Sequence, residues 1–129
     1  MYGFHAQPKG TFNEVIEAAT KALKAEGFGV LSDIDVAATF KARLDIERRP
    51  YRILGACNPA LANQAIAADA DIGLLLPCNV VVREEDDGTV TVAFMDPVAV
   101  LDLVHRPEVS ALAEDVRSRL QRVRQQLAG

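Results

Sequence analysis

The dipeptide cysteine-asparagine occurs twice in this 129-residue chain, as Cys57-Asn58 and as Cys78-Asn79, and the chain has no other cysteine. The sequence between the two copies fits one helix and an extended return, which would bring both copies to the same edge of a sheet. Two thiols and two side-chain amides that converge there could bind a soft metal ion, act as a redox pair or orient a small ligand. Zinc is not predicted, because no third and fourth ligands stand nearby at CxxC or HxxxH spacing.

Packing is the alternative interpretation of the same four residues. Cysteine is among the residue types most often buried, and there it acts as a small apolar filler. Asn58 precedes Pro59, and this pair suits the N-cap and the first position of a helix. Asn79 follows Pro77 closely and suits hydrogen bonds to the local backbone. From the residues alone, both interpretations stay open.

A second candidate site is a group of arginines around one phenol, at the start of a predicted strand. Its members are Arg48, Arg49, Tyr51 and Arg52. Guanidinium forks suit carboxylate or phosphate groups, so Arg49 and Tyr51 are candidates for holding an anionic ligand. The neighbouring acids Asp45 and Glu47 could instead occupy the guanidinium groups and form an internal ion-pair network.

The other polar residues have simpler structural explanations. His5 lies alone on one face of a predicted strand, and Asp96 precedes Pro97 as a helix N-cap. His105 stands near the end of a short helix, where it would complement the helix dipole. The sequence contains no GxSxG elbow, Gly-rich phosphate loop, HExxH or EF-hand loop. Catalytic residues and cofactors therefore stay unknown, and no metal ligand is assigned.

Three classes of function are compatible with these residues. The first is a small dimeric binding or sensing module, with a cleft for a ligand or a soft metal near Cys57 and Cys78. The second is a thiol-dependent or redox enzyme, and the third is a structural or interaction protein without a small ligand. Because a reactive thiol needs a lowered pKa, the titration of the cysteines separates the second class from the others.

Composition and charge exclude several partners. The net charge is -4 and the pI about 5.1, which argues against nucleic acid because phosphate binding needs clustered basic residues. The longest apolar stretch, residues 72–82, falls short of the roughly 20 residues that cross a bilayer. The N-terminus has no basic and apolar regions of a signal peptide. A cytoplasmic protein with free thiols is expected.

Hydrophobic periodicity and turn residues predict one α+β domain over residues 1–129, in the order β-α-β-(α)-β-α-β-β-α. About five strands, mainly antiparallel and backed by helices, are expected at residues 2–6, 28–34, 51–57, 73–82 and 89–95. The first helix starts at Thr11, which forms a capping box with Glu14. Later helices start at Asp35, Asn58, Asp96 and Pro107.

One predicted strand is apolar on both faces. The runs Leu74–Leu76 and Val80–Val82 do not alternate with polar residues, as a strand with one solvated face should. Helices can cover one face, and a second copy of the chain is the preferred cover for the other. The sequence therefore predicts a homodimer.

Three stretches carry a recognisable pattern: RPYRILGACNPALA at residues 49–62, GLLLPCNVVV at 73–82 and MDP at 95–97. They resemble the bacterial domain-of-unknown-function 302 (DUF302) family, and the opening strand and capped helix also fit. The resemblance implies a curved antiparallel sheet backed by helices, similar to the TATA-binding-protein fold, and a homodimer. It implies no known activity, and likeness to a DNA-binding architecture carries no functional weight.

Overall fold

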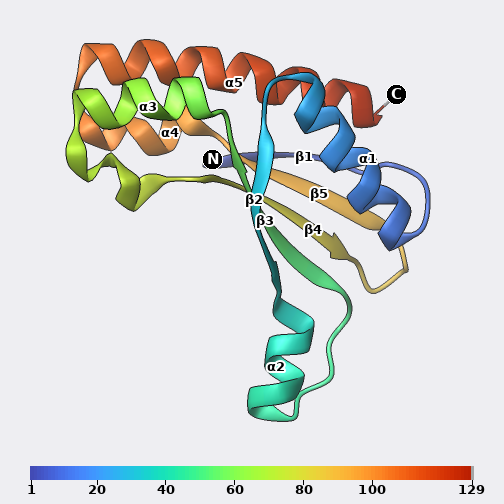
Figure 1. Cartoon of the computed structure of the whole chain (residues 1–129). Helices are drawn as coiled ribbons and strands as arrows, with labels where there is room; N and C mark the ends of the chain where they lie inside the picture. The colour runs from blue at the N-terminus through green and yellow to red at the C-terminus, as the bar shows by residue number, and fades with distance from the viewer. Residues whose placement is uncertain (129) are drawn as a thin grey trace.

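A computed structural model describes residues 1–128, which form five strands and the helices that connect them (Figure 1). The strands are β1 (Gly3–Ala6), β2 (Gly29–Asp35), β3 (Tyr51–Cys57), β4 (Cys78–Glu84) and β5 (Val90–Met95). The α-helices are α1 (Phe12–Ala25), α2 (Val36–Leu44), α3 (Pro59–Ala68), α4 (Pro97–Leu101) and α5 (Pro107–Ala128). Two short 3-10 helices are η1 (Ala70–Leu75) and η2 (Asp102–Val104). This is the predicted α+β fold with a five-stranded antiparallel sheet.

All neighbouring strands run antiparallel, in the order β1-β5-β4-β3-β2. Helices α1 and α5 lie on one side of this sheet, and α2 projects from the other side (Figure 1). The sheet therefore has one face covered by helices and one face that no helix of the described chain packs across. We call the second one the uncovered face.

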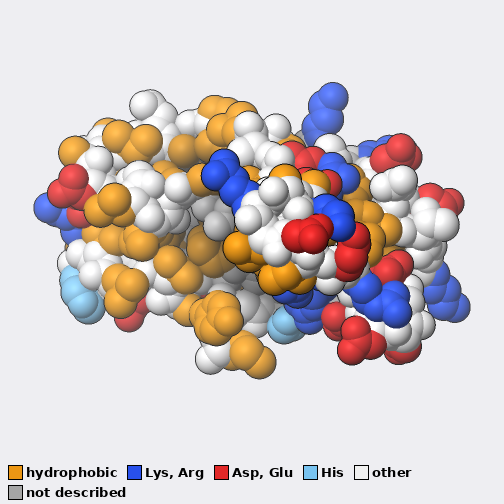
Figure 2. All heavy atoms as spheres, turned by 90° about the horizontal axis from the view of Figure 1, so that it is seen from below, with side chains coloured by type: hydrophobic (Ala, Val, Ile, Leu, Met, Phe, Trp, Pro, Cys, Tyr) orange, Lys and Arg blue, Asp and Glu red, His pale blue; other side chains and the backbone are white. Residues whose placement is uncertain are grey.

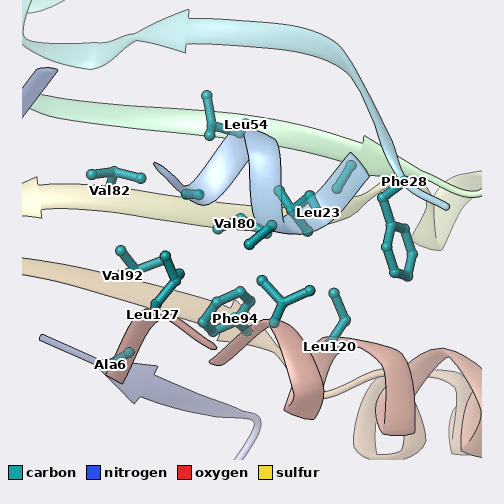
Figure 3. Packing of buried hydrophobic residues seen from close by; sticks show 14 of the residues in the cluster. Ala6, Leu23, Phe28, Leu54, Val80, Val82, Val92, Phe94, Leu120 and Leu127 are labelled. Carbon is teal, nitrogen blue, oxygen red and sulfur yellow. The ribbon is translucent and has the colours of Figure 1, made fainter. Parts of the chain in front are cut away.

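The main core lies between the covered face and the two helices α1 and α5. Leu54, Val80, Val82, Val92 and Phe94 point from the strands toward apolar side chains of the helices (Figure 3). A smaller core joins α3, η1, α4 and the start of α5.

Helix starts follow the predicted capping residues. Thr11 accepts a hydrogen bond from the amide of Glu14, whose carboxylate accepts one from the amide of Thr11. These bonds lower the pKa of the Glu14 carboxyl. The side chains of Asp35, Asn58 and Asp96 cap α2, α3 and α4 in the same way.

The strand predicted at residues 73–82 is wrong in its first half. Residues up to Leu75 form η1 instead, and β4 begins only at Cys78. The side chain of Asp69 caps η1 by accepting a hydrogen bond from the amide of Asp71. Within β4 the side chains do alternate, with Val80 and Val82 buried and Val81 half-buried. The apolar runs therefore belong to two elements, and η1 leaves Leu74 86% exposed.

Helix α2 is an arm that stands away from the body of the molecule (Figure 1). None of its residues is buried, and β3 is the one element with which it makes substantial contact within residues 1–128. We refer to residues 36–49, the helix and the segment that follows it, as the α2 arm. Every helix of the described chain is too short or too polar to span a lipid bilayer.

Candidate functional site

The uncovered face is built from alternate residues of every strand. Because cross-strand partners share a face, the pairs His5 with Ala93, Ala93 with Val81, and Tyr51 with Arg83 place these side chains together. Asn79 lies opposite Gly55 in the same layer. The side chains between them in sequence point to the opposite face and form the core.

A hollow of about 470 Å³ lies on this face, over β1, β5, β4 and the start of β3. Apolar groups of Val81, Ala93 and Met95 line it together with the polar side chains of His5, Tyr51, Asn79 and Arg83. Met1 and Tyr2 also border it, and the Tyr2 side chain is 79% exposed. Seen from below, apolar side chains gather around a hollowed centre (Figure 2).

The polar groups in this hollow differ in how they are satisfied. Arg83 donates from Nε to Glu85 Oε1 at 3.0 Å and from Nη2 to Glu85 Oε2 at 3.4 Å, which lowers the pKa of the Glu85 carboxyl. His5, Tyr51 and Asn79 make no side-chain hydrogen bond to another residue among 1–128. Three polar side chains thus border an apolar hollow, and solvent or a ligand can reach their donors and acceptors.

The two cysteines meet at a different place, a pocket of about 40 Å³ between the sheet edge, α3 and α5. Its lining is almost wholly apolar and includes Leu61, Leu101 and Val116. Cys78 is 6% exposed and lies opposite Ala56, the residue before Cys57. Cys57 is half-buried and lines the same pocket, so the two thiols lie near each other at this end of the sheet.

The environment of both thiols keeps them protonated. Burial, followed by the nearby Cys57 thiol, raises the pKa of Cys78 to about 11, and burial also raises the pKa of Cys57. Such thiols are poor nucleophiles at neutral pH. No three His, Cys, Asp or Glu side chains of residues 1–128 lie close enough to hold a metal ion together.

Of the two asparagines, Asn58 lines the pocket of the thiols and Asn79 does not. Asn58 Oδ1 accepts from the amide of Leu61 at 3.2 Å as the cap of α3, and its amide nitrogen lies over Gly27. Asn79 instead faces the larger hollow on the uncovered face. A helix cap thus accounts for Asn58, whereas Asn79 stays a candidate ligand-binding residue.

The members of the arginine group have different contacts: Arg49 and Arg52 form ion pairs, whereas Arg48 lies over aromatic rings. Arg49 Nη1 lies 2.9 Å from Glu84 Oε2, and Arg52 pairs with Asp33, which lowers the pKa of the Asp33 carboxyl. Arg48 stacks between two rings, 5.5 Å from the centre of Phe40 and 5.8 Å from that of Tyr51.

The arginines do form ion pairs, but with Glu84 and Asp33 in place of Asp45 and Glu47. Asp45 and Glu47 both pair with Lys41. Asp45 is in reach because it lies one helical turn after Lys41. The arginines take partners from neighbouring strands instead. Arg49 is therefore largely neutralised, and Tyr51 is the member of the group that reaches the hollow.

A comparison with known proteins shows the family to which this chain belongs. The model of a protein family described as "Domain of unknown function DUF302" matches residues 4–127, nearly the entire chain. The chain belongs to the DUF302 family. No curated protein matches it.

A solved DUF302 structure shares the fold. It is the crystal structure of an uncharacterized conserved protein from Bacillus stearothermophilus, and its sequence is 28% identical. The superposition covers 98% of each chain with a TM-score of 0.91. The two chains therefore share the overall fold.

Sequence reasoning missed one side chain of this DUF302 site, Arg83. Every second residue of β4 shares a face, so Asn79, Val81 and Arg83 point the same way. The turn at Asp86-Asp87-Gly88 marks where this strand ends in the sequence. The apolar run 80–82 hides this period, because two of the three valines face the core. His5 was visible as an isolated strand histidine, but its neighbours were not.

The buried thiols of this DUF302 chain give a direct chemical prediction. We expect iodoacetamide at pH 8 to modify Cys78 at least ~100-fold more slowly than free cysteine, since only the thiolate attacks. Because the folded state holds the Cys78 proton more tightly than the unfolded chain, stability should also fall between pH 9 and 11. Peptide mapping by mass spectrometry measures the rate, and urea-unfolded protein is the control. Fast labelling of Cys78 in the folded state would contradict the raised pKa.

Proposed function

We propose that this DUF302 protein is a small-molecule binding module whose ligand sits on the uncovered face of the sheet. The observation that carries the proposal is the set of three polar side chains, His5, Tyr51 and Asn79, that border an apolar hollow and are open to a ligand. We also propose that it acts in the cytosol, where the thiols stay reduced. The proposed ligand site thus lies on the uncovered face of the sheet, and not near Cys57 and Cys78 as the sequence suggested.

Size and composition support this site. Small-molecule pockets usually measure about 300–1,000 Å³ and combine an apolar lining with a few placed polar groups. The hollow of about 470 Å³ meets both conditions. The thiol pocket of about 40 Å³ has room for little more than a water molecule.

The lining indicates the chemistry of the ligand. Val81, Ala93 and Met95 offer a flat apolar floor for a ring or a short chain. Tyr51, Asn79 and His5 offer donors and acceptors along its border, while Glu85 already balances the charge of Arg83. A small amphipathic molecule with one polar end, neutral or weakly acidic, suits this arrangement better than a multiply charged anion.

The thiol-dependent enzyme is the weaker candidate. Both cysteines have raised pKa values, and a catalytic thiol needs a lowered one. The two thiols also lack a neighbouring base among the residues that line their pocket.

Fragment binding followed by NMR tests the proposed site. We expect benzamide, phenol and benzoate at millimolar concentration to shift the backbone amide signals of His5, Tyr51, Asn79 and Ala93 in ¹⁵N-labelled protein. Asn79→Ala should weaken the binding of benzamide about 5-fold or more, because a hydrogen bond of about 1 kcal/mol or more is lost.

The matched control is Asn63→Ala, which removes the same group from an exposed position on α3. It should leave benzamide binding unchanged. Shifts confined to the surroundings of Cys57 and Cys78, or no shift from any of the three fragments, would overturn the proposal.

A further inference from the structure

A row of apolar side chains crosses four strands of the uncovered face. In order across the sheet its members are Ile34, Ile53, Val81 and Ala93, each of which is the cross-strand partner of the next. Cross-strand partners share a face of a sheet. Since neighbouring strands lie about 4.8 Å apart, the row from β2 to β5 is about 14 Å long. We call these four side chains the apolar track.

Two hollows lie next to each other over the apolar track. The hollow of about 470 Å³ described above contains Val81 and Ala93, and a second hollow of about 440 Å³ is lined by Ile34 and Ile53. The hollows adjoin, because Tyr51 borders both and Ile53 is the partner of Val81. A ligand that fills both hollows is therefore elongated and apolar over most of its length.

The apolar track keeps part of its surface open. Ile34 is 50% exposed, and Ile53, Val81 and Ala93 are half-buried. A hydrocarbon chain that lies along the track would remove this surface and its own from water. Each methylene buried in this way tightens binding by about 2–4-fold.

One positive charge at the β2 end of the track has no carboxylate beside it. Arg48 lines the second hollow, where its guanidinium lies over the rings of Phe40 and Tyr51. Unlike Arg49 and Arg52, it forms no ion pair with another residue among 1–128. Within the described chain, no Asp or Glu lines this hollow. The charge of Arg48 is thus available to an anionic ligand.

The two rings position Arg48 without using its hydrogen-bond donors. A cation–π contact occupies the face of the guanidinium group, whereas its N–H groups point outward from the edge. Such a fork donates two parallel hydrogen bonds to one carboxylate. Tyr51 borders the same hollow and offers a hydroxyl beside the guanidinium. The end of the track at the α2 arm therefore suits a single carboxylate.

We propose that the ligand of the uncovered face is a linear, medium-chain monocarboxylate that lies across the strands. Its carboxylate binds Arg48, and its hydrocarbon chain follows the apolar track toward Ala93. A second acidic group does not suit the other end, because Glu85 already balances Arg83 there. The inference rests on the function proposed above and names the class of its ligand.

Isothermal titration calorimetry with hexanoate, octanoate and decanoate tests the length of the chain. We expect one molecule to bind per protein chain, and the affinity to rise about 2–4-fold with each added methylene. Octanol, which has the same chain as octanoate but no charge, should bind about 5-fold more weakly or worse. Equal affinities for hexanoate and decanoate, or for octanoate and octanol, would overturn the proposal.

The variant Arg48→Gln tests the carboxylate end. It should weaken octanoate binding about 5-fold or more, because the charged fork is lost, and leave octanol binding unchanged. Arg43→Gln is the matched control, since Arg43 is an exposed arginine of the same arm that lines neither hollow. Unchanged octanoate binding by Arg48→Gln, or an equal loss in Arg43→Gln, would contradict the assignment.

The variant Ile34→Ser tests the second hollow. It should weaken decanoate binding about 3-fold or more, because apolar contact with the chain is lost. Ile66→Ser is the matched control: Ile66 is 48% exposed, close to the 50% of Ile34, but it lies on α3 and lines neither hollow. Similar affinities of the two variants for decanoate would show that the chain does not reach the second hollow, and the proposal would fail.

The class of ligand and the site itself can fail separately. If benzamide shifts the amide signal of Asn79 but octanoate binding does not depend on Arg48, the carboxylate assignment is wrong and the ligand site stands. If neither the fragments nor the carboxylates shift the amide signals of Val81 and Ala93, the ligand site is wrong, and the assignment that rests on it is wrong as well.

Discussion

Leu23→Ala is expected to lower the free energy of unfolding by about 2–5 kcal/mol, one of the largest effects of any single substitution in this chain. Leu23 lies on α1 with no exposed surface, and it packs against the strands in the main core (Figure 3). Its truncation removes apolar contacts and leaves a cavity that the rigid sheet cannot fill. Urea unfolding followed by circular dichroism measures the change.

Leu74→Ala removes the same atoms from a side chain that is 86% exposed. It should change the free energy of unfolding by less than about 0.5 kcal/mol. Similar losses for the two variants would mean that α1 does not pack on the sheet in solution as described.

Gly55→Ala is expected to cost about 1–3 kcal/mol, because the new methyl group has no space. Its carbon would stand 2.2 Å from Ser32 Oγ and 2.8 Å from Pro77 Cγ. The hydroxyl of Ser32 can turn aside, whereas Cγ of the Pro77 ring can shift only as far as a change of ring pucker allows. Thermal unfolding of the variant measures the loss.

Gly73→Ala is the control for this substitution, since nothing lies within 4 Å of the added carbon there and the backbone is in an ordinary conformation. It should be neutral or slightly stabilising. Ser32→Ala combined with Gly55→Ala should recover part of the loss and leave the part due to Pro77. Full recovery would show that the proline ring does not restrict the site.

The parts of this fold that sequence could predict are those set by local chemistry. Thr11 with Glu14, Asn58 with Pro59 and Asp96 with Pro97 each fix a helix start through short-range hydrogen bonds. These signals act within four residues, so no knowledge of distant contacts is needed. They placed three helices, and alternating side chains with turn residues between them placed the strands.

The apolar run at residues 73–82 could not be divided by the same reasoning. A continuous apolar sequence suits a buried strand or a short helix equally well. The choice depends on Ile72, which is fully buried in the smaller core against α4 and α5, elements that follow in the sequence. Because of that contact, the residues up to Leu75 pack with the helices, and the strand begins only at Cys78.

Only some residues of the candidate site could be predicted from the sequence, for a related reason. Its side chains come from β1, β3, β4 and β5, so their meeting depends on strand order as well as on alternation. The repeated Cys-Asn dipeptide suggested one shared site at a sheet edge. The structure separates Asn79 from the thiols, because neighbouring residues of a strand face opposite ways.

The strand order also has a consequence for synthesis of the chain on the ribosome. β1 is made first, but its one neighbour in the sheet is β5, which ends at Met95. Until that residue has emerged, the first strand has nothing to pair with, although β2, β3 and β4 can already assemble into a ladder. The N-terminal residues must therefore stay unpaired until at least three quarters of the protein has been translated.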